Sequence, residues 1–531
     1  MPPRCQRRAY RSGAPGEGAL APLVACRRVS YRIVMDRATF PATIPALLAW
    51  RVAREPERPW LFFEDRVWTL SEVAREVARH AVGLTAQGVV RGDRVAMVLA
   101  NTPDTLFTWL GANQLGAVAV MLNPAHKPAE LTALFRLVTP RVVVASEHGP
   151  LVAASLGALE TSLRAPIVAP SALPTDGPLS DVDVSADDAC VLIATSGTTG
   201  APKAVVQTHR AYTLTAEAFA SWLDLTNDDR LLAVLPLFHI NAQAYSTMGA
   251  LASGELALAR RFSASRFWEE AAALGATQCN GVGAMMHILL RTAPRPADRA
   301  HRIRVFYGAL ALPEETHRAF EARFGLRLTV GYGMSETTFG TVWPHDQAPR
   351  FGTIGRLRQH PRLGEINRAR IVKDDGSDAA VGETGELWLA SPAVTPGYFQ
   401  NPEETAKALE GGWLHTGDLV RCEADGFFTF VSRKKHVIRR RGENVAAAEV
   451  EGVIAAFPGV RDVAVVGVPS ELGEEELVAY VAPDSGVDID VAALRAFVAT
   501  QLADFKVPSE FRVRDALPRT ATERIAKHEL A

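Results

Sequence analysis

The sequence lacks the marks of a disulfide-stapled, zinc-binding or membrane-spanning protein. Five cysteines are scattered through its 531 residues without a CxxC pair, so neither a disulfide framework nor a zinc site is indicated. No apolar run approaches the ~18 residues that a membrane-spanning helix requires. We therefore expect a soluble, cytoplasmic protein with no membrane partner.

A strong excess of charge is missing as well. The formal net charge is −2, from 57 Lys and Arg against 59 Asp and Glu, and such a balance exerts no bulk attraction on nucleic acid or anionic membrane. No internal repeat of solenoid length occurs. Partners must therefore be inferred from individual sites, and nucleic acid is not expected among them.

Residues 1–34 differ from the rest of the chain. They carry seven arginines against a single acid, Glu17, with several glycines and prolines and no sustained helical period. An arginine-rich, acid-poor start is typical of a transit peptide. The alternatives are a disordered tail and a start codon placed too far upstream, with Met35 as the true beginning. Of these we favour a disordered or non-native extension.

The rest of the chain is too long for one domain, because single cores stop growing near ~250–300 residues. From Phe40, helical spacing of apolar residues alternates with short apolar runs. Helix Leu70–Gln87 is followed by strand Arg94–Leu99 and helix Pro103–Leu115, and this alternation predicts a parallel, layered sheet. Further strands are expected at Ala117–Leu122, Arg141–Val144, Ala189–Ala194, Leu231–Leu235, Leu256–Ala259 and Arg304–Tyr307.

The later chain has a different pattern. Gly382–Leu389 and Gly426–Val431 are typical of antiparallel strands, and Ser432–His436 places four basic residues between two apolar runs. A small α+β unit follows. Its expected elements are helices Ala447–Ala456 and Val491–Leu502 and strands Ala464–Val468, Leu477–Val481 and Phe511–Val513. The expected fold class is therefore α/β, with a large N-terminal domain of layered sheets and helices (35–432) and a small α+β C-terminal domain (433–531).

The segment Thr195–Lys203 has the composition of a phosphate loop. Two glycines let successive backbone N–H groups turn toward an anion, hydroxyls add donors, and a lysine adds a charge. Its spacing does not fit the Walker A pattern. The alternative interpretation is a flexible Gly/Thr surface loop.

Three more segments follow in order. Leu235–His239 ends a strand with a histidine, Gly331–Glu336 places an acid after a glycine turn, where it could hold Mg²⁺, and Gly412–Asp418 ends in a carboxylate able to accept hydrogen bonds from a ribose. Taken singly they are also compatible with a strand-end histidine, a helix N-terminal acid and a turn aspartate. Their joint order favours an ATP site.

With these motifs the chain resembles the adenylate-forming superfamily of acyl-CoA synthetases, firefly luciferase and peptide-synthetase adenylation domains, from about Phe40 to Leu530. Through Leu237–Asn241 and Phe262–Trp268 it is most similar to crotonobetaine/carnitine CoA ligases. The resemblance implies an ATP-dependent, AMP-forming ligase that uses Mg²⁺, activates a small acid and passes it to CoA. It also implies a mobile C-terminal domain with its hinge near Lys435, in a monomer or homodimer.

The resemblance assigns roles residue by residue. Around the ATP phosphates it places Thr195, Ser196, Gly197, Thr198, Thr199, Gly200 and Lys203. Around adenine, ribose and the AMP phosphate it places Gly308, Ala309, Tyr332, Gly333, Thr337, Asp418 and Arg433. Glu336 and Thr195 would hold Mg²⁺, and Gly442–Val445 matches the loop that meets the pantetheine arm of CoA. The residues expected to take part in catalysis are Lys203, His239, Glu336, Lys435 and Arg524.

His239 would border the acid pocket, and the expected wall residues are Ala242, Gly281, Gly283, Met285 and Met334. Small residues beside flexible methionines indicate room for a compact acid rather than a long acyl tail.

One motif departs from the family. Most relatives read Pro-x-Thr-x-x-Gly-Lys-Ile near the C-terminus, and that lysine bridges acid and nucleotide; here Pro518–Ile525 carries Glu523 and Arg524 instead. Arginine keeps the charge without the compact geometry, and losing such a donor costs roughly 10²–10³ in rate.

Three explanations follow from this departure. Arg524 works at reduced rate, or the chain is a non-catalytic nucleotide-binding homologue, or the acid or acceptor is unusual. In the last case the chain would be an enzyme of secondary metabolism or antibiotic biosynthesis that couples the activated acid to an amine, including a diazotase that uses nitrite and an aryl amine.

Overall fold

The computed structural model describes residues 40–530, apart from 180–181, 197–201, 309–311, 435–436, 441–442, 470–474, 503, 521–523 and a few further side chains. The extension expected over residues 1–34 lies outside the described residues. Among the described helices, none is both long and apolar enough to cross a membrane.

The first of two large sheets has six strands in the order β6-β5-β3-β4-β7-β8. All its neighbours are parallel except β7 and β8, which pair antiparallel. Its strands are β3 (Arg94–Val98), β4 (Val118–Met121), β5 (Val142–Ala145), β6 (Ile167–Val168), β7 (Ala189–Ser196) and β8 (Pro202–Thr208). The predicted parallel, layered sheet is confirmed.

The second large sheet has nine strands in the order β15-β14-β13-β12-β11-β9-β10-β1-β2. The run from β13 to β1 is parallel, and β2, β14 and β15 add antiparallel edges. Its strands are β1 (Pro59–Phe63), β2 (Arg66–Thr69), β9 (Arg230–Ala233), β10 (Glu255–Leu258), β11 (Gln278–Gly281), β12 (Val305–Gly308), β13 (Arg327–Met334), β14 (Thr337–Val342) and β15 (Arg356–Leu357). Because parallel strands end at one edge, this sheet gathers its loops there.

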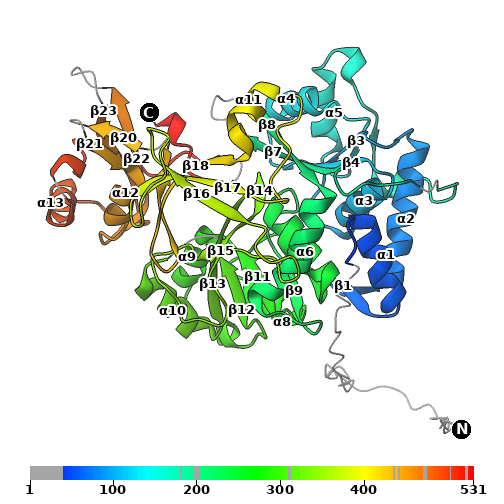
Figure 1. Ribbon diagram of the computed structural model, residues 1–531, viewed down its shortest axis with the longest axis horizontal. Coiled ribbons are helices and arrows are strands. Elements are labelled where there is room, and N and C mark those ends of the chain that lie inside the picture. Colours follow the sequence, from blue (N-terminus) through cyan, green and yellow to red (C-terminus); the bar gives the residue numbers. More distant parts are fainter. Residues whose placement is uncertain are drawn as a thin grey trace, which may run out of the picture.

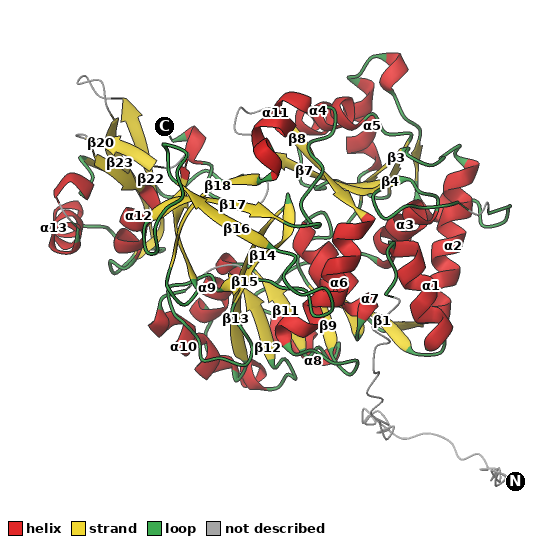
Figure 2. Cartoon of the chain, viewed as in Figure 1, coloured by secondary structure: helices red, strands yellow, loops and turns green. Residues whose placement is uncertain are grey.

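Helices join the two sheets into one core (Figure 2). Helix α2 (Leu70–Ala86) begins at a capping box in which Thr69 and Glu72 each bond the other's backbone N–H, as the sequence predicts. Trp109 of α3 packs against Tyr212 of α6 with ring centroids 6.2 Å apart. The other helices are α1 (Ile44–Arg54), α3 (Pro103–Gln114), α4 (Pro128–Val138), α5 (Gly149–Gly157), α6 (His209–Leu223), α7 (Met248–Ala252), α8 (Phe267–Ala273), α9 (Gly283–Arg291), α10 (Glu314–Phe324) and α11 (Pro402–Ala408).

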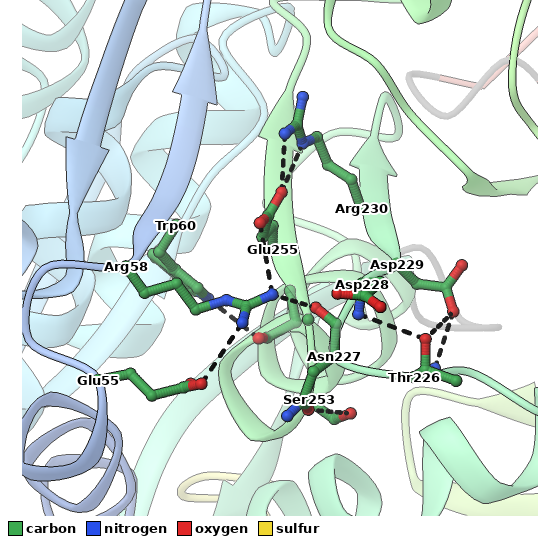
Figure 3. Close-up of polar contacts among 12 residues, drawn as sticks. Glu55, Arg58, Trp60, Thr226, Asn227, Asp228, Asp229, Arg230, Ser253 and Glu255 are labelled. Atoms are coloured by element: carbon green, nitrogen blue, oxygen red, sulfur yellow. Dashed lines mark hydrogen bonds and ion pairs between the residues drawn. The ribbon is translucent and has the colours of Figure 1, made fainter. Parts of the chain in front are cut away.

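Charged side chains link the amino ends of strands β1, β9 and β10 within the nine-stranded sheet, as Figure 3 shows. Arg58, just before β1, contacts the carbonyl of Asn227 and reaches Glu255 at 3.4 Å. Glu255 in turn accepts from Arg230 Nε at 2.9 Å. These contacts lie at the amino ends of β9 and β10, opposite the edge where the loops gather, so they stabilise the scaffold and stay away from the loops.

A four-stranded antiparallel sheet, β16-β17-β18-β19, follows. Its strands are β16 (Arg368–Val372), β17 (Thr384–Ala390), β18 (Leu414–Cys422) and β19 (Phe428–Arg433). The two predicted antiparallel strands correspond to β17 and β19. Asp418 lies within β18, so the turn-aspartate alternative is wrong: alternate residues of this strand are buried and hold it in the sheet.

The C-terminal elements, orange to red in Figure 1, gather at one end of the molecule around a core of their own. They are β20 (Val437–Arg440), β21 (Glu443–Ala446), α12 (Ala447–Ala455), β22 (Val460–Pro469), β23 (Glu475–Pro483), α13 (Val491–Gln501) and β24 (Glu510–Val513). This confirms the α/β fold class with a large N-terminal and a small C-terminal domain. Glu443, Asn444 and Val445 lie in a hairpin strand rather than a loop, because Ile438 and Val445 face this core.

Candidate active site

The carboxyl edge of the nine-stranded sheet brings several predicted residues together. His239 follows β9, Gly281 ends β11, Gly308 ends β12, and Tyr332 lies near the end of β13. Gly281 pairs with Gly308 in register, and Gly308 pairs with Val330 of β13. In open α/β sheets, ligands bind in the crevice outside the carboxyl ends of the strands.

Tyr332, Asp418 and Arg433 form one cluster. The Tyr332 hydroxyl donates to Asp418 Oδ2 at 2.7 Å, and Arg433 Nε lies 2.8 Å from Oδ1. Burial raises the pKa of the Asp418 carboxyl, and the charge of Arg433 only partly offsets this. Three residues expected at adenine and ribose therefore meet around one buried carboxylate whose oxygens each keep a further lone pair.

Glu336 lies at the tip of the hairpin that joins β13 to β14, so it is not a helix N-terminal acid. Its Oε1 accepts a hydrogen bond from the Tyr398 hydroxyl at 2.9 Å. Burial raises the pKa of Glu336, and the bond from Tyr398 opposes that rise. The neighbouring Thr337 is fully buried in β14.

The described ends of the expected phosphate loop form a hairpin. Thr195 pairs with Lys203 and Ser196 with Pro202 across β7 and β8. The residues between them, including Gly197, Thr198, Thr199 and Gly200, lie outside the described residues, as do Ala309, Lys435, Gly442 and Glu523.

Lys203 of β8 contacts Glu404 and Tyr398, and Tyr398 in turn hydrogen-bonds Glu336. Its ammonium forms an ion pair with Glu404 of α11 and lies 5.4 Å from the ring centroid of Tyr398. Tyr398 therefore touches both Lys203 and Glu336. The sequence did not indicate Tyr398 or Glu404 as site residues. A tyrosine and a glutamate near the Asn401-Pro402 start of α11 belong to no recognisable motif.

His239 stands at the start of an unusual helix. The segment η3 (Asn241–Thr247) is a π-helix, a form found frequently at functional sites. Burial, and then the charge of Arg524, lower the pKa of His239 to about 4. The imidazole is therefore neutral near pH 7 and can hydrogen-bond an acid without adding charge.

Arg524 comes from the C-terminal domain. Arg519 and Ile525 form an isolated antiparallel β-bridge, and Thr520 N donates to Arg524 O at 2.7 Å. Although the side chain keeps exposed surface, desolvation lowers its pKa, as does Arg433. Its charge acts on His239 and on Asp418, so the guanidinium lies within electrostatic range of both.

The glycines at this edge are packed closely. A Cβ at Gly281 would lie 2.4 Å from Phe306 Cζ, and one at Gly331 would lie 2.3 Å from the Tyr307 hydroxyl. Ala242 and Met285 are buried, and Met334 is half-buried. At Gly281 and Gly331 the missing side chain therefore makes room for an aromatic ring.

Two family models cover the chain: "AMP-binding enzyme" matches residues 48–399, and "AMP-binding enzyme C-terminal domain" matches residues 449–524. The chain belongs to the AMP-binding enzyme family. Membership confirms the adenylate-forming resemblance, and the chain is an ATP-dependent, AMP-forming ligase of the acyl-CoA ligase type.

Relatives agree with this assignment. A crotonobetaine/carnitine–CoA ligase of Escherichia coli O139:H28 (strain E24377A / ETEC) is 34% identical over 482 residues, covering 86% of this chain and 92% of the relative. One of Shigella sonnei (strain Ss046) is 33% identical over the same span.

Solved structures share the fold. ATP-bound MatB from Rhodopseudomonas palustris matches with a TM-score of 0.83 and 26% identity, covering 92% of this chain and 98% of that one. The O-succinylbenzoate coenzyme A synthetase of Bacillus subtilis, in complex with ATP and magnesium ion, matches with a TM-score of 0.79 and 26% identity, covering 91% and 98%.

Proposed function

We propose that the chain activates a small acid as its adenylate, releases pyrophosphate and transfers the acyl group to CoA. The observation that carries this proposal is the buried Asp418 carboxylate, which accepts from the Tyr332 hydroxyl at 2.7 Å and pairs with Arg433 at 2.8 Å. Adenylation also needs a cation between the acid and the nucleotide, and Arg524 is the residue expected to supply it. The CoA ligases among the relatives favour CoA as acceptor.

In the first step an oxygen of the acid attacks the α-phosphorus of ATP. The bond from that phosphorus to the bridging oxygen breaks, pyrophosphate leaves with the electron pair, and a mixed anhydride forms. Negative charge grows on the α-phosphate oxygens, and Arg524 and Lys203 stabilise it. In the second step the CoA thiolate attacks the carbonyl carbon, and AMP leaves.

The other residues hold the reactants in place. Asp418 accepts from the ribose hydroxyls while Tyr332 lies against adenine, Thr337 and Thr195 lie at the phosphates, and neutral His239 orients the acid. Tyr398 is the one described side chain that hydrogen-bonds Glu336. Glu336 would hold Mg²⁺ together with Thr195, and the ion would neutralise charge on the phosphates. The described residues contain no cluster of three metal-binding side chains.

A rotation of the C-terminal domain would separate the two steps. Arg433 pairs with Asp418 in the four-stranded sheet, and Lys434 Nζ lies 3.3 Å from Glu386 Oε2, so both residues contact the N-terminal domain. We propose a hinge near Lys435, directly after these contacts, with the domain division at residues 432–433. Lys435→Ala should change the rate of adenylate formation relative to the rate of transfer to the acceptor, while leaving ATP affinity unchanged.

A second candidate is transfer to an amine, including diazotisation with nitrite and an aryl amine in secondary metabolism. The observation that favours it is Arg524 itself, because a planar guanidinium fork suits a planar oxyanion better than a single ammonium does.

A pyrophosphate-release screen over small acids and nitrite, with and without CoA or an aryl amine, separates these functions. A CoA ligase yields AMP and a thioester by mass only with CoA. An amine-coupling enzyme needs the amine and is indifferent to CoA. Absence of AMP under every condition would sink both proposals and leave a nucleotide-binding homologue. Asp418→Asn should lower ATP affinity in either case.

A further inference from the structure

The turn that carries His239 is bound by side-chain amides from other parts of the fold. Residues 234–239 lie between the end of β9 at Ala233 and the π-helix that begins at Asn241. Within the turn, His239 N donates to the Pro236 carbonyl oxygen at 2.9 Å. Connecting turns are more mobile than the strands and helices that they join, so the position of His239 depends on the groups that bind this turn.

Asn101 is the first of these amides. It follows β3 of the six-stranded sheet and is 6% exposed. Its Nδ2 donates to the carbonyl oxygens of Leu235 and Ala259, at 2.9 and 3.3 Å, and its Oδ1 accepts from Leu237 N at 2.8 Å. Leu235 follows β9 and Ala259 follows β10. One side chain of the six-stranded sheet therefore joins two strand ends of the nine-stranded sheet.

Gln243 is the second amide and binds the same turn through a different atom. It belongs to the π-helix and is 1% exposed. Its Nε2 donates to the Leu237 carbonyl oxygen at 2.7 Å, and its Oε1 accepts from the Tyr212 hydroxyl of α6. Gln243 N also donates to the His239 carbonyl oxygen at 3.2 Å. Both polar backbone groups of Leu237, two residues before His239, are therefore bound by buried amides.

The pattern of donors and acceptors leaves one orientation for each amide. A backbone N–H can only donate and a carbonyl oxygen can only accept, so Asn101 turns Oδ1 to Leu237 N and Nδ2 to the two carbonyl groups. For the same reason Gln243 turns Nε2 to the Leu237 carbonyl. Buried hydrogen-bonding groups are unfavourable when they are left unpaired. The two amides therefore hold the turn in one conformation.

We propose that Asn101 and Gln243 are positioning residues of the acid site: by binding Leu237 at its N–H and its carbonyl oxygen, they hold His239 where it orients the acid. This inference rests on the proposed function, in which His239 has that role. It assigns a part in acid binding to Asn101, a residue of the other large sheet that acts through the turn. Misplacing a reacting group by about 1 Å can cost on the order of 10²-fold in rate, so the hold on this turn matters for the reaction.

Two variants release the turn. Asn101→Ala removes the bonds to Leu237 N and to the two strand-end carbonyl groups. Gln243→Met keeps the length of the side chain and removes the bond to the Leu237 carbonyl oxygen. Each is also made together with His239→Ala, and melting curves check that every variant folds.

Asn113 of α3 provides a matched control. It is fully buried, and its Nδ2 donates to the carbonyl oxygens of Ala117 and Cys190 at 3.1 and 2.8 Å. These carbonyl groups lie at the amino ends of β4 and β7, the opposite edge of the six-stranded sheet from Asn101. Asn113→Ala therefore removes a comparable amide that joins two strands and does not bind the turn of His239.

Pyrophosphate release is measured with acetate, butyrate or benzoate plus CoA, and with nitrite plus an aryl amine. For the acid that wild type uses, Asn101→Ala and Gln243→Met should lower kcat/KM about tenfold or more, with KM for ATP unchanged. Asn113→Ala should leave both quantities unchanged even where its melting temperature falls as far as that of Asn101→Ala. In the His239→Ala background, Asn101→Ala should cause little further loss, because residues that act through one another are not additive.

The inference is overturned if Asn101→Ala and Gln243→Met keep the wild-type kcat/KM for the acid, if KM for ATP rises as much as KM for the acid, or if the losses from Asn101→Ala and His239→Ala are additive. If Asn101→Ala does not fold, Gln243→Met and its combination with His239→Ala decide by the same criteria.

Amide hydrogen exchange of residues 235–243, followed by mass spectrometry, tests the hold on the turn directly. Exchange should be faster in Asn101→Ala than in wild type, while peptides around Asp418 stay unchanged; unchanged exchange of residues 235–243 would overturn the inference and leave the proposed function intact. Absence of AMP formation by wild type with every acid would instead refute the proposed function, and with it the role of the two amides at an acid site.

Discussion

The hydrogen bond from Tyr398 to Glu336 gives the sharpest test of the proposed Mg²⁺ site. Tyr398→Phe keeps the ring beneath the Lys203 ammonium and removes only the hydroxyl that donates to Glu336 Oε1 at 2.9 Å. A hydrogen bond to a charged group contributes about 1.5–3 kcal/mol. Because 1.4 kcal/mol is tenfold in an equilibrium constant, the Mg²⁺ concentration for half-maximal rate should rise roughly 10- to 100-fold.

The pH dependence of the same variant has a defined sign. Burial already raises the pKa of Glu336, and the Tyr398 bond lowers it, so removing the bond raises the pKa further. The carboxylate then becomes protonated at higher pH, and the acid limb of the pH–rate profile moves upward. Pyrophosphate release measured against pH and Mg²⁺ reports both effects.

A matched control removes a buried tyrosine hydroxyl elsewhere. Tyr480, which accepts from Arg512 at 2.6 Å in the C-terminal domain, is replaced in Tyr480→Phe and should leave both curves unchanged. If Tyr398→Phe has the acid limb and Mg²⁺ demand of wild type, Glu336 does not act as the carboxylate that we assign.

Three further predictions concern single residues of the site and scaffold. Arg524→Met should lower pyrophosphate release roughly 10²–10³-fold while Arg524→Lys loses less than about tenfold, and equal rates in wild type and the Met variant would contradict the role of the cation. Glu336→Gln should abolish activity yet raise the melting temperature at pH 7.5. The pKa of Glu336 is raised in the folded protein, so this carboxyl lowers the free energy of unfolding as the pH rises from its unfolded pKa through its folded pKa. A lower melting temperature for the variant would count against this. The Nδ1 of buried His209 accepts a hydrogen bond from Ile44 N, and burial lowers the pKa of this histidine to about 4. The neutral imidazole therefore contributes about 3 kcal/mol to the free energy of unfolding above pH ~6.5, and this contribution is lost as the pH falls to about 4. Urea unfolding at pH 7.5 and 5 should show a steep loss for wild type and a shallower one for His209→Gln.

Much of the fold was predictable because local patterns agree with it. The apolar spacing of Leu70–Ala86 and its cap at Thr69 define a helix before any tertiary contact is known. The short apolar runs at Arg94–Val98 and Val142–Ala145 identify the buried parallel strands. Asp418 was harder to place, since its segment contains Gly417 with φ of 69° and resembles a turn.

The candidate site was predictable only where a motif carries its chemistry. Asp418, Glu336 and His239 stand in such motifs, and their placement together supports the predicted site. The buried hydrogen bonds of Arg358 to Tyr245 and Tyr307 had no local signal, because they join residues 113 and 51 positions apart in sequence. Such contacts exist only once the sheet and the π-helix have formed.

The two faces of β13 have a consequence for how this enzyme can change over evolutionary time. Tyr332 on one face meets Asp418, while the glycines on the other face leave room for Arg358 and the tyrosines. Substitutions behind the strand can therefore occur without displacing the Tyr332–Asp418 pair expected around the nucleotide. The buried layer behind β13 could diverge by small steps, each retaining a folded protein with that pair intact.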